Sequence, residues 1–182
     1  NPILRFYASD MILTAESDAV YLVLPKARSR GAGIFYLHNK PATKPHPTLN
    51  GAILVEFTTL RHVVSSAAEA EVGALFHNAR VALPIQRLLT SIGHPQPPTK
   101  ITTDNATAQH FVYDNIHQKR SKSWDMRFYW LRDRTNQKQF LITWAAGKTN
   151  LADYFTKHHP ISHHKEKRRV YNLDGENPTP YP

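Results

Sequence analysis

Residues 11–24 read MILTAESDAVYLVL, and Pro25 follows them. This segment of mixed polarity predicts a β-strand that ends at the proline. Asp18 stands inside the segment, although strand interiors are depleted in aspartate and a buried carboxylate needs a partner. The opening strand therefore places an acidic side chain where the sequence nearby offers nothing to neutralise it.

The segments that follow predict an α/β protein. Residues 33–37 and 52–59 predict two further strands with short connections, so the first three strands should form an antiparallel meander. A long helix is expected from Ser65 and Ser66, which are capping candidates, to about Gly93, with a bend or interruption at Pro84. The remaining elements, in chain order, are a strand at 99–103, a helix after Asp104, an amphipathic helix at 121–137, a strand at 140–144 and a short helix from Asn150 to Pro160. The expected fold is a mixed five-stranded sheet with helices on both faces.

The chain is strongly basic. Its 182 residues include 23 Lys and Arg against 14 Asp and Glu, which gives a formal net charge of +9. Such a surplus indicates a polyanionic partner, and nucleic acid is the first candidate. The sequence has neither an apolar run of membrane-spanning length nor a signal segment at its start, so a membrane partner is not expected. The lack of cysteine excludes disulfides, Cys-ligated zinc and thiol catalysis.

Composition divides the chain into three parts. Residues 1–10 show no clear pattern and begin without Met, which favours a linker from a longer chain. Residues 11–160 carry all the predicted elements and form one domain. Residues 161–182 contain a basic run and several prolines, and they predict a disordered tail.

Three more acidic positions follow Asp18 at the ends of predicted elements: Glu69 or Glu71, Asp104 and Asp153. Each has an ordinary explanation, because Asp104 could cap a helix, Asp153 would interact favourably with a helix dipole, and Glu is a good helix former. Together they suit a different purpose. Carboxylates can hold two divalent ions about 3.5–4 Å apart, which activate a water and stabilise the leaving oxygen in phosphodiester hydrolysis. Mg²⁺ prefers such oxygen ligands.

Zinc is the competing metal, because the chain has 11 histidines. The pairs His158-His159 and His163-His164 lie at a predicted helix end and in the tail. They have neither the helical spacing nor the fourth ligand of a zinc site. The sequence therefore favours magnesium.

The local sequence also resembles the ribonuclease H domain that ends the polyprotein of copia-type LTR retrotransposons. The resemblance covers about residues 11–160. It is carried, in order, by Ser17-Asp18-Ala19, Ser65-Ser66-Ala67-Ala68-Glu69-Ala70-Glu71, Asp104-Asn105 with Ala108, Arg120-Ser121-Lys122 leading into Asp125-Met126-Arg127-Phe128-Tyr129 with Arg132, and Ala152-Asp153-Tyr154-Phe155-Thr156-Lys157. Departures from the family pattern include Ser123 and Tyr129, which replace histidines.

The resemblance implies a ribonuclease H-like fold and a metal-dependent endoribonuclease that cleaves the RNA strand of RNA–DNA hybrids during reverse transcription. Carried over by position, the catalytic metal ligands are Asp18, Glu71, Asp104 and Asp153. Helical periodicity leaves Glu69 and Glu71 equally placed. The alanine three residues after the family's ligand favours Glu71, since Ala74 stands there.

The resemblance further implies two Mg²⁺ ions, with Mn²⁺ as a substitute, and an adjoining reverse transcriptase domain in the same polyprotein. It implies a location in a cytoplasmic virus-like particle or in the nucleus. Lys119, Arg120 and Lys122 would contact substrate phosphates, unless they form only a solvated basic loop. Asn105 would orient the substrate or a water on the metal.

Three other classes of protein remain alternatives. Integrases and exonucleases share the fold, but an integrase lacks the helix glutamate and ends its acid set with Glu on a late helix, where this chain has Asp153. A degenerate ribonuclease H-like module would bind nucleic acid or support a reverse transcriptase without catalysis. A basic structural protein with no site would leave Asp18 unexplained.

Overall fold

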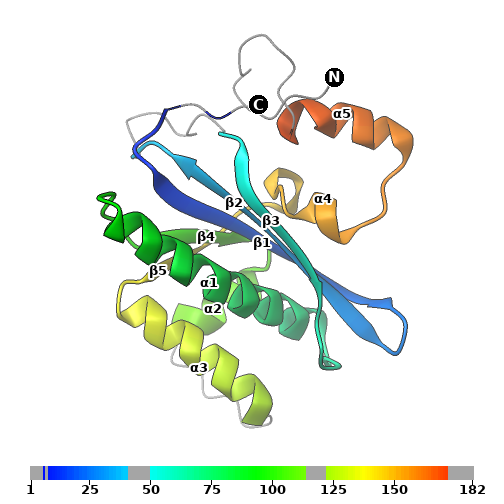
Figure 1. The fold of residues 1–182 in the computed structure, drawn as a ribbon. Helices are drawn as coiled ribbons and strands as arrows, with labels where there is room; N and C mark the ends of the chain where they lie inside the picture. Colours follow the sequence, from blue (N-terminus) through cyan, green and yellow to red (C-terminus); the bar gives the residue numbers. More distant parts are fainter. Residues whose placement is uncertain (1–5, 7, 41–49, 114–121, 172–182) are drawn as a thin grey trace.

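The computed structural model describes residues 6, 8–40, 50–113 and 122–171. A five-stranded sheet with the order β3-β2-β1-β4-β5 forms the centre of these described residues (Figure 1). Its strands are β1 (Ile12–Leu24), β2 (Arg28–His38), β3 (Ala52–Thr59), β4 (Thr99–Thr103) and β5 (Phe140–Trp144). The first three strands pair antiparallel, whereas β1–β4 and β4–β5 pair parallel. The prediction of a mixed five-stranded sheet is confirmed.

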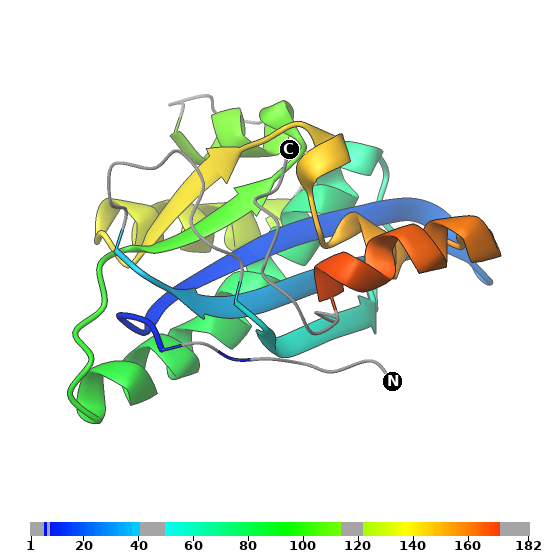
Figure 2. The ribbon, with the colours of Figure 1, turned by 90° about the horizontal axis from the view of Figure 1, so that it is seen from above.

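Helices cover both faces of this sheet. They are α1 (Ala67–Ser91), α2 (Ala106–Tyr113), α3 (Lys122–Asn136), α4 (Asp153–Thr156) and α5 (Ile161–Tyr171), with a short 3₁₀ turn η1 (Gly147–Thr149) before α4. Figure 2 shows α4 and α5 on the near side of the sheet and α1 and α3 on the far side. None of the described helices combines the length and apolar character that crossing a bilayer requires.

The two faces of the sheet bury different apolar clusters because side chains alternate along each strand. Leu13 and Phe35 belong to the large core beneath α1, whereas Ile34 and Tyr36 pack with Leu151 beneath α4. A bend or an interruption was expected at Pro84; helix α1 continues through this residue, which excludes the interruption. Buried apolar residues on both sides of the proline belong to the main core, and tertiary packing of this kind outweighs local helix propensity.

A buried polar contact fixes α1 against the first two strands. The Nδ2 group of Asn78 donates to Ser17 Oγ at 2.9 Å and to the Ala32 carbonyl at 2.8 Å. A Cβ atom on Gly33 would lie 2.2 Å from Asn78 Oδ1, so only glycine allows this approach. The contact holds the middle of α1 beside the strand that carries Asp18.

The prediction of disorder from residue 161 onward is wrong for residues 161–171, which form α5. Aromatic packing explains the difference. The Tyr154 ring on α4 stacks on His159 and His163, and the Tyr154 hydroxyl lies 2.6 Å from His164 Nδ1. These ring contacts give a polar, basic segment a docking point that composition did not reveal. Residues 172–182 and most of residues 1–10 lie outside the described residues.

Candidate active site

The parallel pairing of β1 with β4 brings two acidic residues together. Ser17 and Thr103 are the last paired residues of the two strands. The next residue on β1 is Asp18, and the residue that follows β4 is Asp104. Neighbouring strands lie about 4.8 Å apart, so these two side chains start from adjacent positions. Asp18 is buried with 2% of its surface exposed, and Asp104 is half-buried.

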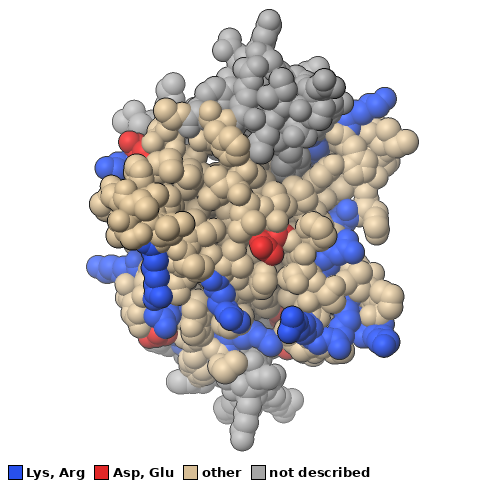
Figure 3. All heavy atoms as spheres, viewed as in Figure 1, with Lys and Arg blue, Asp and Glu red and all other residues tan. Residues whose placement is uncertain are grey.

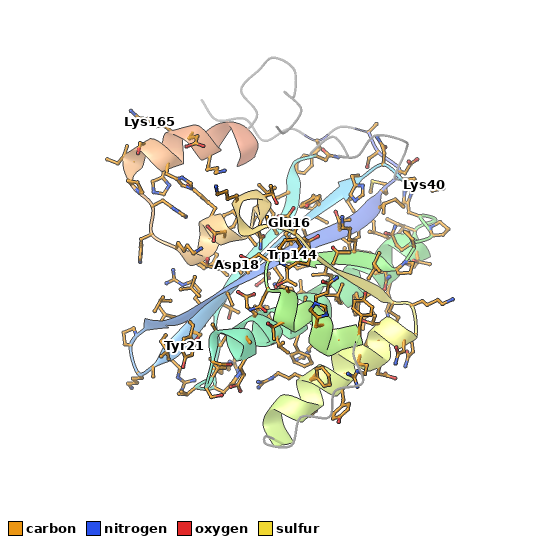
Figure 4. All side chains as sticks on the ribbon, turned by 180° about the vertical axis from the view of Figure 1, so that it is seen from behind. Glu16, Asp18, Tyr21, Lys40, Trp144 and Lys165 are labelled. Carbon is orange, nitrogen blue, oxygen red and sulfur yellow. The ribbon has the colours of Figure 1, made fainter. Side chains whose placement is uncertain are left out.

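The third acid, Glu71, comes from the first turns of α1. Its Oε1 atom accepts a hydrogen bond from the backbone N–H of Ala19 at 3.2 Å, which ties the helix to β1. One carboxylate oxygen from each of Asp18, Glu71 and Asp104 lies within 4.8 Å of the others. The structure therefore gathers three of the four predicted ligands, and in Figure 4 the labelled Asp18 lies at the centre of the molecule.

Glu69 has a different environment from Glu71. Its Oε2 atom accepts hydrogen bonds from the N–H and the hydroxyl of Ser65 at 2.6 and 2.7 Å, and its own N–H donates to Ser66 Oγ at 3.1 Å. This arrangement resembles a capping box that satisfies the open end of α1. Glu69 therefore stabilises the helix start, and its carboxylate is outside the three-acid group.

Asp153, the fourth predicted ligand, lies at the start of α4 and is also outside the three-acid group. Its carboxylate accepts a hydrogen bond from the ammonium group of Lys157 four residues later. Asp153 still lies near enough to raise the pKa of Asp18 and of Asp104. Lys157 has the opposite effect on both groups, so it acts as a built-in cation beside the acids.

Burial and mutual repulsion make the three acids reluctant to ionise. Burial, followed by the charges of Asp18 and Asp104, raises the pKa of Glu71 to about 9. Burial raises the pKa of Asp18 to about 6, against a hydrogen bond from Thr156 that lowers it. The pKa of Asp104 is also raised, first by burial. The Oε2 atom of Glu71 is buried and has no hydrogen-bond partner. A divalent cation would supply the missing partner and offset the repulsion, so these residues fit a metal.

Three contacts fasten the segment around α4 to β1. Glu16 Oε2 accepts from the Leu151 N–H at 2.5 Å, while its Oε1 accepts from the Tyr36 hydroxyl. Asn150 Nδ2 donates to the Ser17 carbonyl at 2.9 Å, and Thr156 Oγ1 donates to Asp18 Oδ2.

The sequence indicated no role for Glu16, Thr156 or Lys157, and no contact between Asn150 and β1. Side chains alternate along a strand, so the sequence placed Glu16 on the same face of β1 as Asp18, and this spacing could have marked Glu16 as a neighbour of the site. The contacts of Asn150 and Thr156 with β1 join residues more than 130 positions apart, which no local pattern reports. The Lys157–Asp153 pair has the i,i+4 spacing of a helical ion pair, which is a local signal.

The predicted substrate-contacting residues are only partly described. Asn105 Oδ1 accepts from the Ala108 N–H at 3.0 Å, so Asn105, and not Asp104, caps α2. Lys119 and Arg120 lie outside the described residues, as does the side chain of Lys122, the first residue of α3. Lys and Arg side chains gather along the lower edge of the face in Figure 3, as the net charge predicts.

No protein-family model matches the sequence. Among solved structures, the chain is similar to LC11-RNase H1 in complex with an RNA/DNA hybrid, with a TM-score of 0.54 and 9% identity over 78% of this chain and 91% of that one. It is also similar to the N-terminal ribonuclease H domain of Rv2228c from Mycobacterium tuberculosis, solved as a fusion with maltose-binding protein. That match has a TM-score of 0.50 and 11% identity over 80% of this chain and 91% of that one. The chain therefore has a ribonuclease H-like fold.

Proposed function

We propose that this protein is a metal-dependent endoribonuclease that cleaves the RNA strand of RNA–DNA hybrids. The observation that carries the proposal is the convergence of Asp18, Glu71 and Asp104 on one point at the end of the parallel β1–β4 pair. Three ionised carboxylates from three separate elements repel one another unless a cation binds them. A fold of the ribonuclease H type supports the same proposal.

Asp18, Glu71 and Asp104 would hold Mg²⁺, or Mn²⁺ in its place, and Asp153 remains a proposed fourth ligand. When bound, such ions activate a water and stabilise the leaving oxygen of a phosphodiester. Lys157 holds Asp153 at the edge of the site, and Thr156 orients the carboxylate of Asp18. Gly147 lets the turn after β5 approach Asp104, because a Cβ atom there would lie 2.7 Å from Asp104 Oδ2.

The proposed substrate follows from charge and from the resemblance of the sequence to copia-type ribonuclease H domains. A net charge of +9 favours a polyanion. Lys119, Arg120 and Lys122 would contact backbone phosphates, which gives affinity without sequence specificity. Asn105 would orient the substrate through its amide nitrogen, since its oxygen caps α2. Recognition of the hybrid would rest on groove shape and 2′-hydroxyl groups.

The same resemblance leads us to propose a cellular context. The domain would follow a reverse transcriptase in a retrotransposon polyprotein and remove template RNA after first-strand synthesis. It would act in a cytoplasmic virus-like particle or in the nucleus.

The test is cleavage of an RNA–DNA hybrid by the purified chain in Mg²⁺, with double-stranded DNA as the control substrate. Cleavage should stop with EDTA and in the Asp18→Asn, Glu71→Gln and Asp104→Asn variants. Glu69→Gln is the matched control, because it changes the same helix but leaves the three-acid group intact. Hybrid binding without cleavage in either Mg²⁺ or Mn²⁺ would favour the degenerate binding module, and cleavage that survives EDTA would contradict the metal site.

A further inference from the structure

Trp144 is an exposed aromatic residue held against the backbone of Asp104. It ends β5 and pairs with Thr103, the residue that precedes Asp104. Its indole Nε1–H donates to the Asp104 carbonyl at 2.8 Å, yet 50% of the residue is exposed. In Figure 4 Trp144 lies in the same central region as Asp18 and Glu16. A large ring is thus fixed to the backbone of a proposed metal ligand while half of it faces solvent.

Exposure alone does not distinguish this residue. Phe57 on β3 is 67% exposed and Leu141 on β5 is 47% exposed, and single exposed apolar side chains are common on protein surfaces. The difference is the anchor at Asp104, which fixes the indole orientation. A rigid aromatic surface binds a partner with little loss of side-chain freedom.

The chemistry of the exposed part indicates the kind of partner. The N–H group is the only polar group of indole, and the Asp104 carbonyl already accepts from it. What remains is an apolar π surface, which suits a sugar or base face and not a phosphate oxygen. In an RNA–DNA hybrid the bases are stacked, whereas the wide, shallow minor groove displays the sugars.

We infer that Trp144 is a substrate-contacting residue whose indole packs against a sugar in the minor groove of the hybrid, beside the acid cluster. The inference rests on the proposed function and adds a contact that depends on neither charge nor metal. Removing the indole should weaken binding of the hybrid while the acids, which perform the chemistry, remain in place.

The first test is steady-state cleavage of a hybrid by the full chain. Trp144→Ala should raise KM by about 5- to 100-fold, as expected for loss of an aromatic contact with nucleic acid, and change kcat by less than about threefold. Trp144→Phe keeps a ring but loses the anchor to Asp104, and it should recover most of the KM loss. A purely structural role for the anchor predicts the reverse, with Phe no better than Ala.

Two controls separate this contact from general effects of exposed apolar residues. Leu141→Ala alters the same strand, and Phe57→Ala alters the opposite edge strand of the sheet. Both should leave KM unchanged. Thermal unfolding of each variant checks that the fold is intact, and an unstable Trp144→Ala variant leaves Trp144→Leu as the ring-free substitute.

The second test measures binding without catalysis. Hybrid titrated into the chain in EDTA should quench tryptophan fluorescence, and the quenching should disappear in Trp144→Phe although Trp124 and Trp130 remain. Quenching by single-stranded RNA but not by hybrid would overturn the groove contact, as would an unchanged KM in Trp144→Ala. If the wild-type chain does not cleave the hybrid at all, the proposed function is wrong. If it cleaves the hybrid and Trp144→Ala has the same KM, only the inference about Trp144 is wrong.

Discussion

Replacing Glu71 with Gln should stabilise the metal-free protein at neutral pH. Glu71 has a pKa raised to about 9, whereas an ordinary glutamate has a value of 4.5. The unfolded chain therefore loses this proton near pH 4.5 and the folded chain keeps it until about pH 9. The contribution of Glu71 to the free energy of unfolding is fully present below pH 4.5 and is lost as the pH rises to about 9.

The size of the effect follows from linkage. Each pKa unit corresponds to about 1.4 kcal/mol. The ionisable carboxyl group of Glu71 therefore lowers the free energy of unfolding by about 3 kcal/mol at pH 7 and by about 6 kcal/mol above pH 9, relative to its value below pH 4.5. Gln has nearly the same shape and cannot ionise. At pH 7 the variant should gain about 3 kcal/mol over the wild type, or roughly 6–12 °C in Tm.

Urea and thermal unfolding in EDTA between pH 4 and pH 9 measure this difference. The stability gap between variant and wild type should be small at pH 4 and widen as the pH rises. Mg²⁺ should raise the Tm of the wild type more than that of the variant, because the metal needs the ionised carboxylate. Glu69→Gln is the control, and it should lose about 0.5–1 kcal/mol by weakening the helix cap. A Glu71→Gln variant that is less stable than the wild type at pH 8 would refute the reasoning.

Three further changes test the supporting contacts. Gly33→Ala should lower the free energy of unfolding, measured in urea, by about 1–3 kcal/mol, because the added methyl group meets Asn78. Adding Asn78→Ala should recover part of this loss, and strictly additive losses would contradict the clash. Thr156→Val removes the donor that lowers the pKa of Asp18, so the free energy of unfolding should fall by about 1–3 kcal/mol at pH 8 and by less at pH 5. Equal losses at the two pH values would argue against an ionised Asp18. Glu16→Gln leaves one carbonyl oxygen for two donors, the Tyr36 hydroxyl and the Leu151 N–H, so amide hydrogen exchange in residues 150–157 should become faster. Unchanged protection would show that Glu16 does not hold residues 150–157 against β1.

The strands were predictable because their signals are local. Alternation and flanking prolines, glycines or asparagines define a strand over a few residues, and residues 52–59, 99–103 and 140–144 form strands with the predicted bounds. The long helix was predictable from its capping serines and apolar spacing. Its continuity through Pro84 was not, because packing against the core decides whether a proline interrupts a helix.

The sequence also indicated some residues of the candidate site and could not distinguish others. Asp18 stood out in the sequence because it lies inside a strand pattern, and Asp104 because it directly follows one. Glu69 and Glu71 could not be separated by helical periodicity, since both flank the apolar stripe. The structure separates them, because one carboxylate meets Ser65 and the other meets β1.

The sheet, the long helix, the positive charge and the set of acids available for a metal followed from the order of amino acids, because propensity and periodicity act over short stretches of chain. The meeting of Asp18, Glu71 and Asp104, the contacts of Asn150 and Thr156 with β1, and the docking of α5 on Tyr154 became visible only in the folded chain. These outcomes depend on strand register and on contacts between distant residues, whose free energies exist only once the chain is packed.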